Sequence, residues 1–362
     1  MSKSIRFRAF LLLTILVAEF GALEGGLRLY SAFEGSRTFQ SLFMDDPAVG
    51  IRLRPGANIR YTTVEFSTDI TINAQGVRDS DPIGPKPSGE RRILVLGDSL
   101  VLSVQVSLAE TFCKRLESRL NATSGPTHWR VINGGVQGYG PVDEWLFYEH
   151  VAAAFQPDIV LIVTFVGNDA TEAADLGSWV EAGKPIRVDQ PGVRWFRRIV
   201  RSSIVLQMVR VRWDQLRSRF EYGTPEPPLA TYLASPPPAV ARGLEVTREV
   251  YGRIAARAKA DGAQTAVALM PARFQVNDED FGNYDHLIRE MGAQLDRNAG
   301  SRRFAEALAP LGLPMIDLLP VLTSQPNPKG VFFQRTVHLT PRGHDEVASA
   351  LFDFFKRSGL VH

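Results

Sequence analysis

The chain has 362 residues, of which 44% are hydrophobic and 22% are charged, an ordinary balance for a globular protein with a sizeable core. Its 41 lysines and arginines nearly balance its 39 aspartates and glutamates, so the net charge of +2 gives no reason to expect a nucleic-acid partner. A single cysteine, Cys113, excludes a disulfide framework and any CxxC metal or redox motif, and no histidine spacing suggests a metal or a cofactor.

The N-terminus has the pattern of an export signal. Lys3, Arg6 and Arg8 precede an apolar run at residues 9–23, and positive charge before such a run is retained in the cytoplasm. The run is shorter than the ~20 residues that cross a bilayer comfortably, and no clean cleavage site follows it. We expect residues 1–30 to be an uncleaved membrane helix, with a cleaved signal peptide as the first alternative and a buried core helix as the second.

Residues 31–90 are expected to form a β-rich extension that ends in a linker. Residues 30–50 are predicted to form a connector. Residues 51–78 alternate in polarity, are rich in β-branched side chains and contain Gly76 as a turn signal, which indicates a small β-hairpin element. Residues 79–89 contain three prolines and are typical of a linker.

From residue 91 onward, strands and helices are predicted to alternate. Short apolar runs typical of buried parallel strands lie at residues 92–97, 130–133, 158–164, 265–270 and 314–318. Helices are predicted from the capping box of Ser107 and Glu110 toward Leu120, from Pro141 to Phe155, and after Thr340 as N-cap. This alternation predicts a doubly wound α/β sheet within residues 91–362.

Residues 170–245 interrupt the alternation and are expected to be an insertion. Eight arginines lie between Arg194 and Arg219, with Asp214 as the only acid among them and apolar residues between. A basic amphipathic helix of this kind at residues 193–220 can lie on an anionic membrane surface. The alternative that we favour is a cap helix packed over the ligand site, with its arginines in solvent.

Four polar segments follow the predicted strands. They are Gly-Asp-Ser-Leu at residues 97–100, Asn-Gly-Gly-Val-Gln-Gly at 133–138, Gly-Asn-Asp at 167–169 and His-Leu-Thr-Pro-Arg-Gly-His at 338–344. Ligands bind at the carboxyl ends of the strands in an open parallel sheet. We therefore expect the four segments to meet at one edge of the sheet.

The residue types in these segments fit acyl transfer through a serine nucleophile. Ser99, at a strand-to-helix turn, can present both its hydroxyl and its backbone N–H. Gly138 lets a second N–H approach an oxyanion because it has no side chain in the way, and the Asn168 amide is a third donor. Such donors are worth ~3–4 kcal/mol each in serine hydrolases. His338 can take the Ser99 proton and return it to the leaving group.

Together the four segments make the chain resemble the SGNH/GDSL hydrolase superfamily, over roughly residues 91–357. The resemblance implies a flavodoxin-like three-layer α/β/α sandwich. It implies Ser99 as nucleophile, His338 as base, and Ser99, Gly138 and Asn168 as the oxyanion hole. The N-terminal helix and the segment at residues 73–79 are similar to exported bacterial members. They imply a membrane-anchored protein whose catalytic domain lies in the periplasm or at the outer face. The alternative is a protein that is secreted after signal cleavage.

One departure from the superfamily concerns the third member of its triad. An aspartate usually stands two or three residues before the histidine, whereas this chain has Thr336 and Arg335 there. A Ser–His dyad can still function with the tautomer held by a backbone carbonyl or by water. The alternative is a weakened or inactive enzyme.

Other residues have supporting or open roles. Asp98 and Asp169 are expected to accept hydrogen bonds from loop N–H groups, and Asn133 to support its own loop. Arg273, just after the fourth predicted strand of the sheet, is a candidate for substrate contact. His344 is expected to be structural rather than the base.

The sequence therefore predicts a serine esterase that removes or transfers an acyl group, with acetyl favoured, on a cell-envelope or extracellular carbohydrate. The carbohydrate rests on the resemblance alone. The alternatives are a lipase or thioesterase at the membrane surface and a catalytically impaired binding or assembly protein of the envelope. Its expected partners are an acylated carbohydrate or lipid and a membrane, with no nucleic acid, no cofactor and no metal.

Overall fold

The computed structural model describes residues 3–33, 39–79, 81–123, 125–174, 203, 205–206, 209 and 227–361. The chain divides into two compact units, one formed by Met1–Gln40 with Val188–Thr224 and the other by Ser41–Arg187 with Pro225–His362. Apart from four of its residues, the predicted basic helix at residues 193–220 lies outside the described part of the chain, as does most of the predicted insertion.

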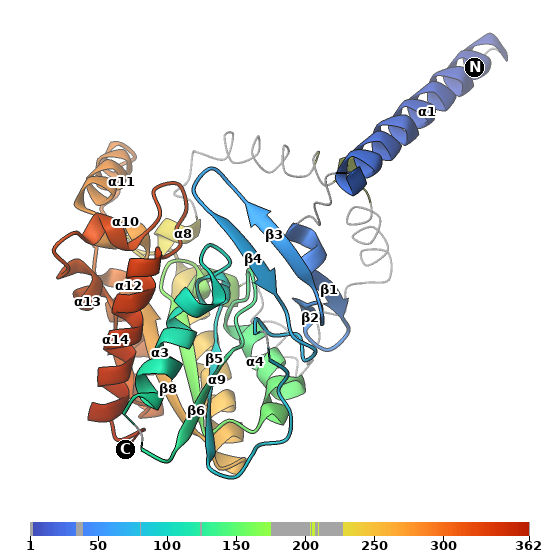
Figure 1. The fold of residues 1–362 in the computed structure, drawn as a ribbon. Coiled ribbons are helices and arrows are strands. Elements are labelled where there is room, and N and C mark those ends of the chain that lie inside the picture. The colour runs from blue at the N-terminus through green and yellow to red at the C-terminus, as the bar shows by residue number, and fades with distance from the viewer. Residues whose placement is uncertain are drawn as a thin grey trace. The chain divides into compact units, whose positions relative to one another are not determined.

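The first unit contains α1 (Lys3–Phe33), a helix of 31 residues (Figure 1). Within α1, Arg28 Nε lies 2.7 Å from a carboxylate oxygen of Glu24. The other oxygen of Glu24 accepts hydrogen bonds from Ser203 Oγ at 2.9 Å and Val205 N at 3.1 Å. Over the residues that the structure describes, no helix has the length and apolar character needed to cross a membrane. The transmembrane helix expected at residues 1–30 gains no support from the structure.

The second unit is built on a five-stranded parallel sheet with the order β6-β5-β7-β8-β9. Its strands are β5 (Glu90–Leu96), β6 (His128–Asn133), β7 (Ile159–Phe165), β8 (Gln264–Met270) and β9 (Met315–Asp317). Counted along the chain within this sheet, the order is 2-1-3-4-5, which is the flavodoxin-like order. Ile93 of β5 lies beside Val131 on one side and Ile159 on the other. The predicted α/β fold with a parallel sheet is confirmed.

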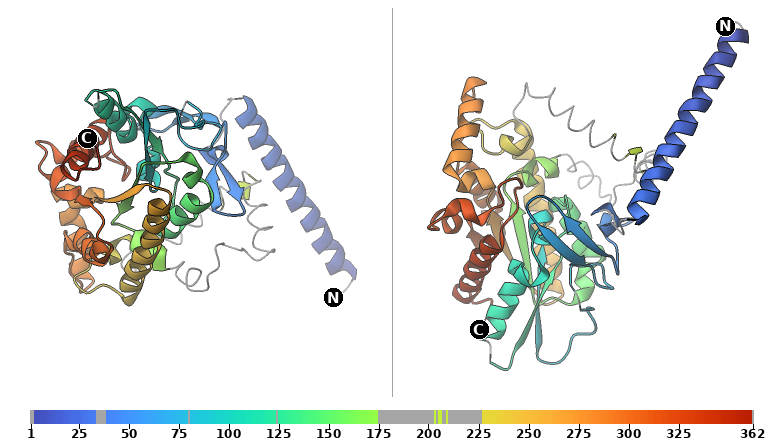
Figure 2. Two further views of the ribbon diagram at one scale, coloured as in Figure 1. Left: turned by 90° about the horizontal axis from the view of Figure 1, so that it is seen from below. Right: turned by 45° about the horizontal axis from the view of Figure 1, so that its top comes forward.

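Helices cover both faces of the sheet (Figures 1 and 2). On one face, α3 (Phe112–Asn121) packs against α14 (Pro341–Arg357), and on the other α4 (Pro141–His150) packs against α9 (Pro238–Ala260). The apolar side chains of α3 and α14, such as Leu116 and Phe355, are fully buried against the strands. The result is the predicted three-layer sandwich.

Further helices lie along the chain. They are α2 (Ser99–Leu102), α8 (Pro227–Ala230), α10 (Arg273–Val276), α11 (Asp278–Glu290), α12 (Ala299–Leu308) and α13 (Leu319–Thr323), with 3₁₀ turns at Phe39–Leu42, Leu108–Glu110, Ala152–Phe155, Ala309–Leu311 and Pro328–Val331.

The helix predicted to run from Ser107 toward Leu120 is divided in two. Glu110 accepts hydrogen bonds from Ser107 N at 3.1 Å and Ser107 Oγ at 2.6 Å, which closes a capping box over the 3₁₀ turn. Thr111 then adopts an extended backbone, with φ −62° and ψ 146°, and its side chain accepts from Lys114 N to cap α3. Two N-cap signals in succession therefore produce two short helices.

The extension before the sheet contains more strand than the sequence predicted. Two antiparallel hairpins form it, β1 (Phe43–Asp46) with β2 (Gly50–Leu53) and β3 (Asn58–Thr62) with β4 (Ser67–Thr71). The first hairpin lies largely in the predicted connector at residues 30–50. Asp46 makes its turn, since the side chain accepts a hydrogen bond from Ala48 N at 2.9 Å.

Arg78 ties this extension to α2 and to the loop that follows it. The residue is 1% exposed, and its guanidinium donates hydrogen bonds to the backbone oxygens of Leu102 at 2.9 Å, Val106 at 2.6 Å, and Ser103. Burial lowers the pKa of Arg78 to about 10. The segment just C-terminal to Ser99 is thus held by a residue of the extension.

Candidate active site

Ser99 is the first residue of α2, directly after β5. The turn before Ser99 requires a glycine at position 97. A Cβ there would lie 2.3 Å from Val101 Cγ2, and the φ of Gly97 is 156°. Asp98 caps α2 by accepting a hydrogen bond from Leu100 N at 2.8 Å. These contacts hold Ser99 at the carboxyl edge of the sheet between β5 and β7, where doubly wound folds bind ligands.

His338 completes a dyad with this serine. Its Nε2 lies 3.0 Å from Ser99 Oγ. The histidine is carried by a tight loop before α14, closed by an antiparallel bridge between Phe332 and Leu339 and by a 2.9 Å hydrogen bond from Phe333 N to His338 O. Burial lowers the pKa of His338 to about 4. The imidazole is therefore neutral at pH 7 and its Nε2 can accept a proton.

The other ring nitrogen of His338 has no carboxylate. Among the described residues, no group forms a hydrogen bond with the buried Nδ1. Thr336, at a position where the superfamily has its aspartate, accepts a 3.3 Å hydrogen bond from His338 N instead. Asp345 of α14 is ion-paired with Arg115 at 2.6 Å and Arg119 at 2.8 Å. The arrangement is a Ser–His dyad.

The loop that carries Gly138 approaches α2 closely. Asn133 supports it, donating a hydrogen bond to Val101 O at 2.7 Å and accepting one from Gly135 N at 3.0 Å. A Cβ on Gly135 would lie 2.3 Å from Leu102 N. Gly138 is exposed, has φ 72°, and no described atom lies within 4 Å of where its Cβ would be. The Gly138 backbone is therefore open to a ligand.

The segment after β7 brings in Asn168 and Asp169. Asn168 Nδ2 donates a hydrogen bond to Glu172 Oε1 at 2.6 Å, which uses one of the two amide N–H groups. Asp169 accepts a hydrogen bond from Phe165 N at 2.8 Å and so fixes the turn. An amide N–H of Asn168 can serve an oxyanion while the first bond persists.

Carboxyl groups gather beneath the serine turn. Burial raises the pKa of Asp98 to about 7. Burial and then the charge of Asp98 raise the pKa of Glu144, and burial followed by Glu144 raises the pKa of Asp169. Glu144 and Glu172 were not singled out from the sequence, because they lie on helices whose contact with the strand ends has no local signal. Over the described residues, no set of three or more His, Cys, Asp or Glu side chains is arranged to hold a metal ion.

Arg273 lies against the loop of His338. Its Nη1 donates hydrogen bonds to the backbone oxygens of Phe333, at 3.3 Å, and Gln334, and its Nε is 3.0 Å from Asp280. The guanidinium of this candidate for substrate contact is thus engaged with the protein. Its position suits a role in holding the histidine loop.

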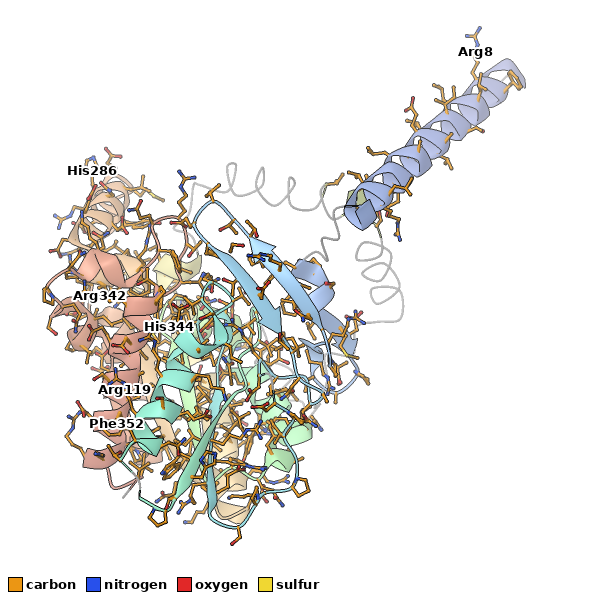
Figure 3. The ribbon with its side chains drawn as sticks, in the orientation of Figure 1. Arg8, Arg119, His286, Arg342, His344 and Phe352 are labelled. Carbon is orange, nitrogen blue, oxygen red and sulfur yellow. The ribbon has the colours of Figure 1, made fainter. Side chains whose placement is uncertain are left out.

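His344 lies where α14 meets α3 (Figure 3). Its Nδ1 accepts a hydrogen bond from Phe112 N at 3.2 Å, and the two rings are stacked with centroids 5.7 Å apart. Burial first, and then the charges of Arg78 and Arg115, lower the pKa of His344 to about 3. The neutral ring acts here as an acceptor for the first N–H of α3.

The serine–histidine dyad lies at the carboxyl edge of a sheet in flavodoxin order, with the glycine and asparagine loops beside it, which is the arrangement expected from the resemblance to SGNH hydrolases. A family model described as an SGNH hydrolase-like domain, acetyltransferase AlgX, matches residues 234–361, which include His338. The matched segment of this chain is similar to that domain, and Ser99, Gly138 and Asn168 lie before it.

Several solved structures are similar over most of their length. One titled TesA has 14% identity and a TM-score of 0.41, with coverage of 74% of this chain and 99% of that one. A lipase/acylhydrolase from Enterococcus faecalis has 14% identity and a TM-score of 0.42, with 75% and 97% coverage. Axe2, an acetylxylan esterase from Geobacillus stearothermophilus, has 14% identity and a TM-score of 0.40, with 73% and 93% coverage. No curated protein matches the sequence significantly.

Proposed function

We propose that this protein is a serine esterase of the SGNH type that cleaves or transfers an acyl group on a carbohydrate of the cell envelope or the cell exterior. The observation that carries the proposal is the 3.0 Å approach of His338 Nε2 to Ser99 Oγ at the carboxyl edge of the sheet. The acetyl group as the preferred acyl group is supported by the description of the matching family model as an acetyltransferase domain.

The first step forms an acyl-enzyme. His338 Nε2 takes the proton from Ser99 Oγ while that oxygen attacks the ester carbonyl carbon. The N–H groups of Ser99 and Gly138 and the amide of Asn168 face the negative charge that develops on the carbonyl oxygen. The intermediate collapses with cleavage of the C–O bond, and the imidazolium gives its proton to the departing alkoxide.

The second step decides between hydrolysis and transfer. Water or an acceptor hydroxyl loses its proton to His338 as its oxygen attacks the acyl carbon, and Ser99 recovers its proton when the acyl bond breaks. No carboxylate stabilises the imidazolium from Nδ1 among the described residues. Replacing the aspartate of a serine-protease triad by asparagine costs ~10⁴ in rate, so we expect slow hydrolysis of simple aryl acetates.

The lack of a carboxylate at Nδ1 of His338 also favours a second candidate function. A histidine without its carboxylate partner fits a binding or assembly protein of the envelope that has kept the fold with an impaired site. A lipase or thioesterase that acts on longer acyl chains is the alternative within the enzyme class.

A serine-directed phosphonate tests the proposal. The full-length protein should be labelled, and Ser99→Ala should abolish both labelling and aryl acetate hydrolysis because the attacking oxygen is gone. His338→Ala should remove most of the rate. Ser324→Ala, which changes an exposed serine, is the matched control and should behave as the wild type.

Hydrolysis that persists in Ser99→Ala would refute the assignment of the nucleophile. A folded wild-type protein that is never labelled would favour the binding protein. Comparing acetyl with octanoyl esters separates the carbohydrate acetylesterase from the lipase.

A further inference from the structure

The loop of His338 is held by a side chain from the N-terminal extension. Glu65 lies in the turn between β3 and β4, and its carboxylate accepts hydrogen bonds from Gln334 N at 2.9 Å and from Arg335 N at 3.1 and 3.0 Å. Beside it, the rings of Phe66 and Phe333 are in tilted contact, with centroids 5.7 Å apart. The tip of the β3–β4 hairpin therefore packs on the segment that leads to the catalytic histidine.

Arg273 holds the same segment through its carbonyl groups. Gln334 shows the arrangement most clearly, since its N–H donates to Glu65 while its carbonyl accepts from Arg273. The guanidinium is itself fixed by Asp280 at 3.0 Å. A carboxylate from the extension and a guanidinium from the sheet domain thus bind the same backbone segment, three to five residues before His338.

The contact of Glu65 lies at the position of the missing triad aspartate. The N–H of Arg335 that Glu65 binds belongs to one of the two positions where the superfamily has its triad aspartate. This chain therefore has a carboxylate beside the triad position, supplied by a different element and directed at the backbone instead of at the imidazole. With Nδ1 of His338 unpaired among the described residues, the orientation of the ring depends on the loop backbone and on the hydrogen bond to Ser99.

We propose that Glu65 is a positioning residue for His338: by binding the N–H groups of residues 334 and 335 it holds the histidine loop in the conformation in which Nε2 reaches Ser99. The inference rests on the proposed function. It assigns the β3–β4 hairpin to the active site as the element that replaces the orienting role of the missing aspartate.

The contact lies in solvent, so its positioning role can be measured separately from any effect on stability. Gln334 and Arg335 are exposed, and so are their hydrogen bonds to Glu65. Exposed hydrogen bonds exchange readily with water and add little to global stability. Small displacements of a catalytic group, by contrast, can cost 10²-fold in rate.

The test compares Glu65→Ala and Glu65→Gln with Asp69→Asn in the full-length protein. Asp69 is on the same hairpin and is exposed, and its 4.0 Å ion pair with Arg60 lies away from the loop, so it is the matched control. We expect Glu65→Ala to lower kcat on aryl acetates by about 10- to 100-fold with KM unchanged and the melting temperature almost unchanged. Glu65→Gln keeps one acceptor oxygen and should fall between Glu65→Ala and the wild type. Asp69→Asn should equal the wild type.

A second measurement detects the contact of Glu65 with the loop independently of catalysis. Amide hydrogen exchange at residues 334 and 335 should speed up in Glu65→Ala and stay unchanged in Asp69→Asn, because only the first variant removes the acceptor. Wild-type kcat in Glu65→Ala, with or without faster exchange, would overturn the inference and leave the proposed function intact. A wild-type protein that is never labelled by the phosphonate and never hydrolyses aryl acetates would refute the proposed function. Even in that case, unchanged amide exchange in Glu65→Ala would separately refute the contact between Glu65 and the loop.

Discussion

The imidazole of His338 has Ser99 at one nitrogen, and at the other it has no partner among the described residues. Both facts bear on its charge. Burial disfavours the imidazolium, and a hydroxyl does little to offset that cost, so the pKa of His338 falls to about 4. In a complete triad the aspartate would favour the imidazolium and move the pKa the other way.

The pH dependence of Ser99 labelling tests this account. The neutral imidazole is the base, so the labelling rate should rise with pH, reach half its maximum near the pKa of about 4, and be flat above pH 6. Thr336→Asp should shift this midpoint upward by about one unit or more and raise hydrolysis, because a carboxylate beside the ring stabilises its charged form. Circular dichroism at each pH separates titration from unfolding.

A wild-type midpoint near 6.5 would show that the ring is solvated or has a carboxylate partner. A high rate that Thr336→Asp leaves unchanged would mean that an acid remote in sequence already supplies the third member.

At the scale of elements, the site depends on how closely the loop after β6 approaches α2. A Cβ on Gly135 would lie 2.3 Å from Leu102 N and 2.7 Å from the carbonyl carbon of Val101. Backbone atoms cannot move aside as a flexible side chain can, so the two elements would have to separate.

Gly135→Ala should therefore destabilise the protein by ~1–3 kcal/mol, the usual cost of overpacking, and should lower Ser99 labelling even at temperatures where the variant is folded. Urea denaturation and phosphonate labelling measure the two effects. Gly84→Ala is the matched control, because no atom of the described residues lies within 4 Å of its Cβ position. Equal stability of both variants would contradict the close approach.

The sequence predicts the elements whose signals are local. The five apolar runs became β5 to β9, and Thr340 caps α14 by accepting from Gly343 N as its Thr-Pro pattern suggests. The chain order of the polar segments predicted Ser99 and His338 at one edge, since parallel strands end together.

What the sequence could not predict depends on contacts between distant segments. Glu65 and Arg335 are 270 positions apart, and nothing around Glu65 distinguishes it from any acid in a hairpin turn. Arg273 was placed correctly at the end of its strand, but whether it faced substrate or protein depended on a loop 60 positions later. The first hairpin was missed because β1 ends in two aspartates and β2 begins with a glycine, residue types that are uncommon in strands.

At the scale of the whole molecule, α1 has large apolar side chains in solvent within its own unit. Leu12 and Leu16 are each 61% exposed and Val17 is 64% exposed. Apolar surface of this extent is costly in water. Basic residues precede it, as in export signals.

We propose on these grounds that the chain is exported, with the domain that carries Ser99 outside the cytoplasm. A reporter that is active only outside the cytoplasm, fused after His362, should be active, and a reporter active only inside should be silent. Leu12→Arg should block export, because arginine in the middle of an apolar run costs ~2.5–3.5 kcal/mol on insertion. Leu29→Arg, at a leucine that is 73% exposed and lies beyond the run, should leave export intact. An active inside reporter in the wild type would refute export, and equal export of the two variants would show that the apolar run is not the signal. If export holds, the size of the exported chain on a gel, against a chain starting at Ser31, distinguishes a retained helix from a cleaved one.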